Sequence, residues 1–322
     1  MTKPELRWGI IGCGDVVMNK SGPSLLLADS SVICSVMNRN KTKAEKYAQE
    51  NRIPTWTGDA SEIMQDPDID IVYIATPPDS HQDYTLAAAR AGKHVLVEKP
   101  MALNSEQAKK MVDVCSDRGV RLFVAYYRRF QPHAEKMHKI IREGEIGRPV
   151  QAFIDIGFKM ENPGSTWKLD PKISGGGYFV DVGCHRLDLM VSLLGDVVEA
   201  NGVVSVMDDD SKVEDCVSIN LKFKSGCHGS VTADFRSGRN ADRFSIFGTR
   251  GSLHNEWLDQ QKFQLLRDQN RTDYEFEKLA APHLGLIRHI EDVLLRGGPN
   301  RTSGSEALVT ENILDTVVRH RL

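Results

Sequence analysis

Three side chains in this sequence have the chemistry of proton transfer: Lys99, Asp181 and His185. Lys99 lies in a Glu98-Lys99-Pro100 turn directly after a short apolar run, His94 to Val97. If that run is a strand of a parallel sheet, the lysine stands at the carboxyl edge, where such sheets bind ligands. The unperturbed pKa of histidine is about 6.5, which suits proton transfer. The unperturbed pKa of lysine is about 10.4, so a lysine must first lose its charge to act as a base. A solvated lysine and a local Asp–His helix pair are the plainer interpretations.

Asp181 and His185 fall on a predicted helix over residues 180–194. Asp181, His185 and Asp188 each follow a residue of the apolar stripe described below, so they have the same spacing on an adjacent side of the helix. They form a polar stripe that can line a cleft. Asp181 and His185 are two candidate metal ligands four residues apart, but no nearby residue supplies a third ligand. We therefore expect no metal. The apolar stripe recurs at steps of four and three and predicts one buried face; it comprises Val180, Cys184, Leu187, Val191 and Leu194.

A glycine turn near the start supplies a second chemistry, the binding of a dinucleotide. A predicted strand, Leu6 to Ile11, leads into Gly12-Cys13-Gly14. The first glycine permits a tight turn, and the second lets the backbone approach a pyrophosphate. The helix beginning at Asp15 and Val16 would hold the phosphates at its N-terminus. Val17 takes the place of the usual third glycine or alanine, so we expect a slightly shifted helix.

The choice of cofactor depends on Asn38 and Arg39, which follow the second predicted strand. An acidic residue here would bind the ribose hydroxyls of NAD and repel a 2′-phosphate. Asn38 is neutral, and Arg39 could pair with that phosphate through two hydrogen bonds. The sequence therefore favours NADP, while stacking of Arg39 on the adenine would be compatible with NAD as well.

Alternation of short apolar runs with helical segments predicts a doubly wound α/β domain of Rossmann type over residues 1–123. Its parallel sheet must place the glycine turn and Lys99 at one edge. The expected strands are 6–11, 32–37, 55–56, 69–75, 94–97 and 121–125, and the expected helices are 41–51, 60–65, 80–91 and 105–117.

The pattern changes after Pro132 and predicts an α+β domain over residues 124–322. Alternating polar and apolar residues between 197 and 266 indicate one broad, mostly antiparallel sheet. A helix over 133–143 and a strand beginning near 149 precede it, and two helices, 284–295 and 305–319, close the chain.

Composition limits the classes of partner. The chain has 322 residues, a net charge of -3 and 26% charged residues, without the basic field that nucleic-acid binding needs. It has no apolar stretch long enough for a membrane helix or a signal peptide. The six scattered cysteines indicate a reducing compartment. We therefore expect a cytoplasmic protein that acts on a small molecule.

Five motifs together resemble the glucose-fructose oxidoreductase and inositol dehydrogenase family, Gfo/Idh/MocA. They are Gly12-Cys13-Gly14, Ala75-Thr76-Pro77-Pro78-Asp79-Ser80-His81, Glu98-Lys99-Pro100, Arg128-Arg129-Phe130-Gln131-Pro132, and the series of glycines, Asp and His between Gly175 and Gly195. The motifs occur in the family's order and span nearly the whole chain. Tyr127 departs from the family, because many relatives have Asn before the paired arginines.

The resemblance implies a Rossmann domain followed by a domain with an open-faced sheet, whose exposed face forms a homodimer or homotetramer. It implies that Lys99 is catalytic, that Asp181 and His185 meet it across a cleft, and that the Lys99–Pro100 bond is cis. The expected reaction is hydride transfer between NAD(P) and a sugar, polyol or diol. Lys99 and His185 share the proton work, in an order that the sequence leaves open, while Asp181 orients the substrate or His185.

Further residues are expected near the cofactor. Thr76 and Pro77 would bound its adenosine side; His81 would contact it or cap a helix; Glu98 would contact the nicotinamide ribose or set the geometry of the lysine. Trp167 and Lys168 resemble a Trp-Arg pair that reaches the cofactor in relatives. Two alternative functions share the fold: a glycosidase that uses bound NAD for transient oxidation, and a non-catalytic NAD(P)-binding regulator.

Overall fold

The computed structural model describes residues 5–159, 167–207 and 211–321. Contacts divide the chain into two compact units. The first unit comprises residues 1–102, 106–127 and 279–308, and the second comprises 103–105, 128–278 and 309–322. The chain leaves the first unit close to the expected division between 123 and 124, but this unit also contains a segment from the end of the chain.

The first unit contains a six-stranded parallel sheet in the order β3-β2-β1-β4-β5-β6. The order reverses between β1 and β4, which defines the switch point where doubly wound sheets bind ligands. Nearly every side chain of β1, β4 and β5 is buried, so these strands appear in the sequence as apolar runs. The strands are β1 Leu6–Ile11, β2 Ser31–Met37, β3 Thr55–Thr57, β4 Ile71–Ile74, β5 His94–Val97 and β6 Leu122–Val124. The expected parallel sheet is confirmed.

Helices connect these strands. Asn40 and Asp59 cap two of them, because their side chains accept backbone N–H groups of Lys43 and Ser61. The α-helices are α1 Gly22–Leu26, α2 Lys41–Asn51, α3 Ala60–Gln65, α4 His81–Arg90, α5 Ser105–Asp117 and α9 Leu284–Arg296. Shorter turns are the π-helix η1 Val17–Ser21 and the 3-10 helices η2 Pro78–Ser80 and η3 Tyr127–Phe130.

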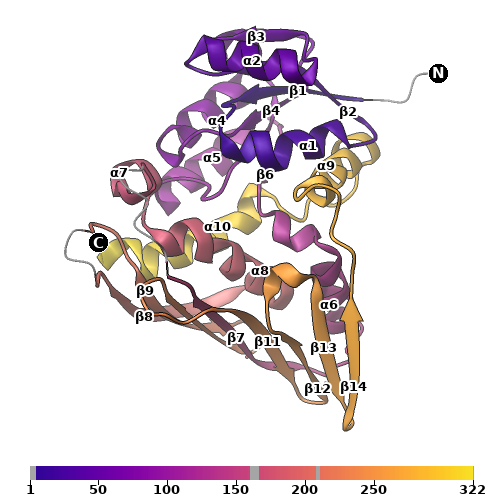
Figure 1. Ribbon diagram of the computed structural model, residues 1–322, viewed down its shortest axis with the longest axis vertical. Helices are drawn as coiled ribbons and strands as arrows, with labels where there is room; N and C mark the ends of the chain where they lie inside the picture. Colours follow the sequence, from indigo (N-terminus) through magenta and orange to yellow (C-terminus); the bar gives the residue numbers. More distant parts are fainter. Residues whose placement is uncertain (1–4, 160–166, 208–210, 322) are drawn as a thin grey trace. The chain divides into compact units, whose positions relative to one another are not determined.

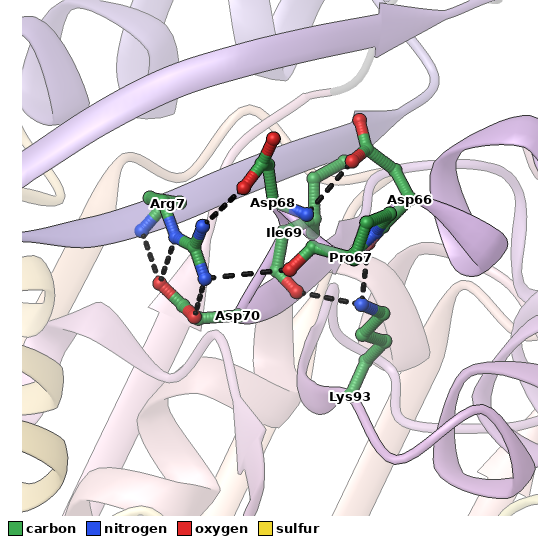
Figure 2. Close-up of polar contacts among 7 residues, drawn as sticks. All are labelled: Arg7, Asp66, Pro67, Asp68, Ile69, Asp70 and Lys93. Carbon is green, nitrogen blue, oxygen red and sulfur yellow. Dashed lines mark hydrogen bonds and ion pairs between the residues drawn. The ribbon is translucent and has the colours of Figure 1, made fainter.

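Charged side chains hold the amino ends of the central strands (Figure 2). Arg7, at the start of β1, binds both carboxylate oxygens of Asp70, at 2.7 and 3.0 Å, and donates to Asp68 at 2.7 Å. Lys93, just before β5, donates to the carbonyl oxygens of Asp66 and Ile69 at 2.5 and 2.7 Å. These contacts stabilise the edge of the sheet opposite the ligand-binding edge.

Residues 279–308 return to the first unit through specific hydrogen bonds. Glu291 accepts from the backbone N–H of Ser30 and the hydroxyl of Ser31, both at 2.8 Å. Thr302 donates its hydroxyl to the Val124 carbonyl at 2.6 Å, and its own carbonyl accepts the Val124 N–H at 2.9 Å. Local periodicity identifies α9 as a helix but carries no information about which sheet it joins.

The second unit contains an eight-stranded sheet in the order β14-β13-β12-β11-β7-β10-β9-β8. Among the described strands of this sheet, β7 and β10 form the one parallel pair, which confirms the expected mostly antiparallel sheet. The strands are β7 Pro149–Gly157, β8 Val197–Ser205, β9 Cys216–Phe223, β10 His228–Asp234, β11 Ala241–Gly248, β12 Gly251–Asn255, β13 Lys262–Arg267 and β14 Asn270–Glu275.

Side chains of this sheet alternate between buried and exposed, most regularly along β9. Helix α8 packs on β7 of this sheet, and α6 packs on α8; Figure 1 shows both helices next to the sheet. The helices are α6 Pro132–Arg142, α7 Pro171–Ser174, α8 Cys184–Leu194 and α10 Gly304–Val317, with the π-helix η5 Phe179–Gly183 and the 3-10 helices η4 Trp167–Leu169, η6 Leu258–Gln260 and η7 Arg319–Arg321.

All six cysteines are free thiols, in agreement with their scattered spacing. Across the described residues, every helix falls short of the length and apolar character needed to cross a bilayer. The described chain is thus built from two sheet-based units without covalent cross-links between its cysteines.

Candidate active site

The glycine turn lies at the switch point of the first sheet. Gly12 has φ of +98°, and a Cβ there would lie 2.6 Å from the Ala75 carbonyl oxygen at the end of β4. Its N–H donates to the Met37 carbonyl of β2 at 2.8 Å. No atom lies within 4 Å of a Cβ built on Gly14, so one side of this residue is open. A pyrophosphate can therefore approach the backbone, which is the fit that a dinucleotide requires.

The helix after this turn begins with two α-helical residues, Asp15 and Val16, continues as the π-helix η1 and then becomes α1. Val17 is fully buried, and the close packing that a third glycine usually permits occurs instead at Gly22. A Cβ on Gly22 would collide with the Tyr47 hydroxyl and the Val17 carbonyl. Gly22 was not among the predicted site residues, although a glycine soon after an incomplete fingerprint is a detectable signal.

Asn38 and Arg39 follow β2 beside the glycine turn. The Asn38 side chain accepts a hydrogen bond from the Asn40 N–H at 2.9 Å and also hydrogen-bonds the Cys13 thiol. Burial raises the pKa of the Cys13 thiol, and the hydrogen bond with Asn38 opposes the rise. Arg39 is exposed, and its guanidinium has no hydrogen bond or ion pair with any described residue. The guanidinium is thus available to a bound phosphate.

Glu98 is a buried carboxylate directly before Lys99. The Tyr73 hydroxyl donates to it at 2.5 Å, and the Lys99 backbone N–H donates to its other oxygen at 3.2 Å. Burial raises the pKa of Glu98, while the Tyr73 hydrogen bond and the charges of Lys99 and Lys20 oppose the rise. The Lys99–Pro100 bond is cis, as the resemblance implied. Glu98 is therefore held in place beside Lys99 by hydrogen bonds from Tyr73 of β4 and from the Lys99 N–H.

His81 begins α4 and is completely buried. Its Nδ1 lies 3.0 Å from the Pro100 carbonyl oxygen, and its Nε2 lies 2.8 Å from the Thr76 carbonyl oxygen. Ser80 donates its hydroxyl to the hydroxyl of Thr76 at 2.7 Å. The turns that follow β4 and β5 are thus connected through one imidazole ring.

Two residues that we did not predict, Lys20 and His283, lie with Tyr127 close enough to Lys99 for their charges to interact. The Tyr127 ring stacks on His283 with centroids 4.6 Å apart, and Lys20 Nζ lies 5.9 Å from the Tyr127 centroid. Burial and the charges of Lys20 and Lys99 lower the pKa of His283 to about 3, so its imidazole is neutral. Lys20 follows the glycine turn closely enough to have been considered, whereas no local pattern marks His283.

In the second unit, Asp181 and His185 lie on different kinds of helix. Asp181 belongs to η5 and His185 to the first turn of α8, so the expected regular helix over 180–194 begins with a wider π turn. The carboxylate of Asp181 accepts from Lys168 Nζ at 2.9 Å, and Lys168 Nζ lies 5.9 Å from the Trp167 centroid. The structure thus brings the predicted Trp167-Lys168 pair and Asp181 together. Lys99 belongs to the other unit, and its meeting with Asp181 and His185 stays a prediction.

Asp188 differs from the polar stripe expected of it. Its side chain is completely buried, and both carboxylate oxygens bind the Arg129 guanidinium, at 2.6 and 2.7 Å. Burial raises the pKa of Asp188, and the arginine opposes the rise. Asp188 therefore anchors α8 to the start of the second unit and does not line a cleft, because a buried charge needs a hydrogen-bonded partner of opposite sign.

Glu214 holds the beginning of the helix that carries Asp181. Its carboxylate accepts the N–H groups of Gly177 at 2.6 Å and Val180 at 3.0 Å. A carboxylate is a favourable partner for the N–H groups at the start of a helix. Glu214 was not among the predicted site residues, because a single glutamate at the start of a predicted strand carries no signal of this contact.

A parallel sheet with a glycine turn at its switch point is the arrangement that binds dinucleotides. Comparison with known families agrees. Residues 6–126 match the oxidoreductase family with an NAD-binding Rossmann fold, and residues 134–254 match the GFO/IDH/MocA C-terminal domain. The chain belongs to the GFO/IDH/MocA family of oxidoreductases.

Similar proteins cover almost the entire chain. Oxidoreductase P35 of Formosa agariphila is 33% identical over 320 residues, which are 97% of this chain and 98% of that protein. The aldose-aldose oxidoreductase of Caulobacter crescentus, solved with glycerol, has a TM-score of 0.89 and 26% identity, covering 98% and 97% of the two chains. A levoglucosan dehydrogenase, solved with NADH and levoglucosan, has a TM-score of 0.87 and 25% identity, covering 97% and 96%. The chain is thus an NAD(P)-binding oxidoreductase.

Glu214 predicts a specific pH dependence of stability. Burial raises its pKa to about 7, although the two N–H donors oppose the rise, whereas a glutamate in an unfolded chain titrates near about 4.3. The folded chain therefore holds this proton more tightly, and the group's contribution to stability falls as the pH rises from about 4.3 to about 7. Glu214→Gln should reduce the loss of unfolding free energy between pH 5 and pH 8 by up to about 3 kcal/mol.

Urea denaturation at the two pH values measures this difference. Glu199→Gln is the control, because Glu199 is exposed on β8. The assignment is contradicted if Glu214→Gln and the wild type lose the same stability between the two pH values.

Proposed function

We propose that this oxidoreductase transfers hydride between the nicotinamide of NADP or NAD and a hydroxyl-bearing carbon of a sugar, polyol or diol. The observation that carries the proposal is the position of Lys99. It follows buried Glu98 at the carboxyl end of β5, two strands from the glycine turn after β1. The named substrates of the similar proteins, aldoses and levoglucosan, support the substrate class.

The described residues fit a dinucleotide. The open side of Gly14 leaves room for the pyrophosphate, and exposed Arg39 lies beside the turn. When bound, the nicotinamide supplies or accepts the hydride. We assign to cofactor binding Gly12, Gly14, Asp15, Val16, Asn38, Arg39, Thr76, Pro77, Glu98, Trp167 and Lys168.

Lys99, His185 and Asp181 carry the proton chemistry in this proposal. In the direction of oxidation, Lys99 or His185 takes the proton of the substrate hydroxyl while the carbon loses hydride. In reduction the same group returns a proton to the carbonyl oxygen. Asp181, whose carboxylate binds Lys168, orients the substrate or His185. Glu98 sets the position of the lysine, since Tyr73 and the Lys99 N–H hold both of its oxygens.

Removal of the lysine amine tests the mechanism. Lys99→Met should lower turnover by about 100-fold or more, because general acid–base catalysis contributes at least this factor. Cofactor affinity should stay within about threefold, since the phosphates and ribose bind elsewhere. Turnover is followed as absorbance of the reduced nicotinamide in a screen of sugars, polyols and diols, and affinity by calorimetry.

Lys110→Met on the exposed side of α5 is the matched control. Near-normal turnover by Lys99→Met contradicts the mechanism. A negative screen, together with cleavage of a chromogenic glycoside, would instead support the glycosidase, and cofactor binding without either reaction would support the regulator.

We propose further that NADP is the preferred cofactor. Arg39 is exposed and has no ion pair with a described residue, and Asn38 beside it carries no charge that would repel a phosphate. Arg39→Ala should raise the Kd of NADPH by about 10- to 100-fold, which corresponds to the loss of charged hydrogen bonds, and should leave the Kd of NADH within about threefold. Calorimetric titration with both cofactors measures the change.

Arg90→Ala provides the control, because Arg90 is exposed at the far end of α4. Tighter binding of NADH than of NADPH by the wild type, or an equal loss for both cofactors in Arg39→Ala, would refute the preference.

The exposed face of the second sheet is proposed to bind a second copy of this chain, giving a homodimer or homotetramer. Phe153 of β7 and Phe247 of β11 contact edge to face, with centroids 5.9 Å apart, and both are more than a third exposed. His254 lies against Phe247, with centroids 5.1 Å apart. Contiguous exposed apolar surface of this kind marks interaction sites, and the resemblance implies self-association. We place the protein in the cytoplasm, where free thiols persist.

Charge at the centre of this face should prevent association. The double variant Phe153→Asp and Phe247→Asp should elute as a monomer with unchanged circular dichroism, because an interface cannot bury unpaired carboxylates. Light scattering coupled to size-exclusion chromatography gives the mass. Leu27→Asp, at a more exposed apolar site on the first unit, should keep the mass of the wild type. An unchanged mass of the double variant contradicts the proposal.

A further inference from the structure

His81 occupies an unusual position for a histidine in the first unit. It is completely buried, yet both ring nitrogens face backbone carbonyl oxygens: that of Pro100 at 3.0 Å and that of Thr76 at 2.8 Å. One carbonyl directly follows Lys99 in the sequence, and the other directly precedes Pro77. A side chain without exposed surface cannot form a contact face for cofactor or substrate.

The two carbonyl oxygens can only accept, so each contact is a hydrogen bond only when the facing nitrogen carries a proton. Neutral imidazole carries one proton and the imidazolium carries two. Burial lowers the pKa of His81, and backbone hydrogen bonds with Thr76, Pro100 and Met101 oppose the shift. The imidazolium therefore donates to both turns, whereas the neutral ring donates to one turn and only packs against the other. The Thr76-Pro77 turn is also supported by the hydrogen bond from Ser80 to Thr76.

We propose that His81 is a positioning residue that fixes the turn of Lys99 relative to the Thr76-Pro77 turn. Nδ1 determines where the lysine turn stands, and Nε2 determines where the Thr76-Pro77 turn stands. The inference rests on the proposed function, in which the first turn supplies the proton-transfer group and the second borders the cofactor. His81 thereby sets the distance between the proton-transfer group and the bound cofactor without touching the substrate.

Two amide substitutions separate the contacts. The side-chain nitrogen of Asn occupies a place similar to Nδ1, and that of Gln a place similar to Nε2. His81→Asn therefore keeps a donor for the Pro100 carbonyl, and His81→Gln keeps one for the Thr76 carbonyl. His81→Ala keeps neither.

Kinetics and cofactor binding read out the two contacts. His81→Ala should lower kcat by about 10- to 100-fold, the order of loss caused by a misplaced catalytic group, and raise the cofactor Kd. His81→Asn should restore kcat but not the Kd, and His81→Gln should restore the Kd but not kcat. Leu86→Ala, at a buried position of the same helix, controls for general destabilisation and should change neither.

A readout independent of turnover separates this inference from the proposed function. The rate of reductive methylation of Lys99, followed by mass spectrometry, should rise in His81→Ala and return to the wild-type rate in His81→Asn. If the wild type has no nicotinamide-linked turnover, the proposed function fails. The labelling rates then still test whether His81 positions the turn of Lys99. Equal effects of the Asn, Gln and Ala substitutions on labelling and cofactor affinity, or an unchanged His81→Ala, would overturn the positioning role.

Discussion

The close approach of Gly12 to the Ala75 carbonyl is the constraint on which the ligand-binding edge of the first unit depends. Any side chain at this position would force β1 and β4 apart at their carboxyl ends. Because the two strands stay together, the glycine turn, the Thr76 turn and the lysine turn stand side by side. The bond from Gly12 to Met37 adds the end of β2, which carries Asn38 and Arg39.

Buried charged groups fix the functional elements of each unit internally. Glu98 is held by Tyr73, Glu214 by the N–H groups of Gly177 and Val180, and Asp188 by Arg129. Removing one partner of such a contact leaves an uncompensated polar group, which costs more free energy than the intact contact contributes. These contacts therefore restrict the arrangements that the turn of Lys99 and the helix of His185 can adopt.

The sequence predicted the bounds of most helices and strands to within one or two residues. This accuracy holds where a whole strand, or one face of a helix, is buried. The strands 6–11 and 94–97 and the helices 41–51 and 105–117 coincide with β1, β5, α2 and α5, because burial leaves a local apolar pattern. The family motifs located Lys99, Asp181 and His185. Glu214 and His283 escaped detection because their partners lie far away in the chain, and the return of residues 279–308 depends on contacts of Glu291 and Thr302 that no local period records.

The two π turns have a consequence for how this chain can diverge. Both η1, after the glycine turn, and η5, which carries Asp181, contain a wider turn at the start of a functional helix. A π turn accommodates one extra residue, whereas in a regular α-helix each added residue rotates all later side chains by about 100°. A one-residue insertion or deletion at these two places can therefore be absorbed locally. Length variation among related chains should concentrate there and leave the following helix faces in register.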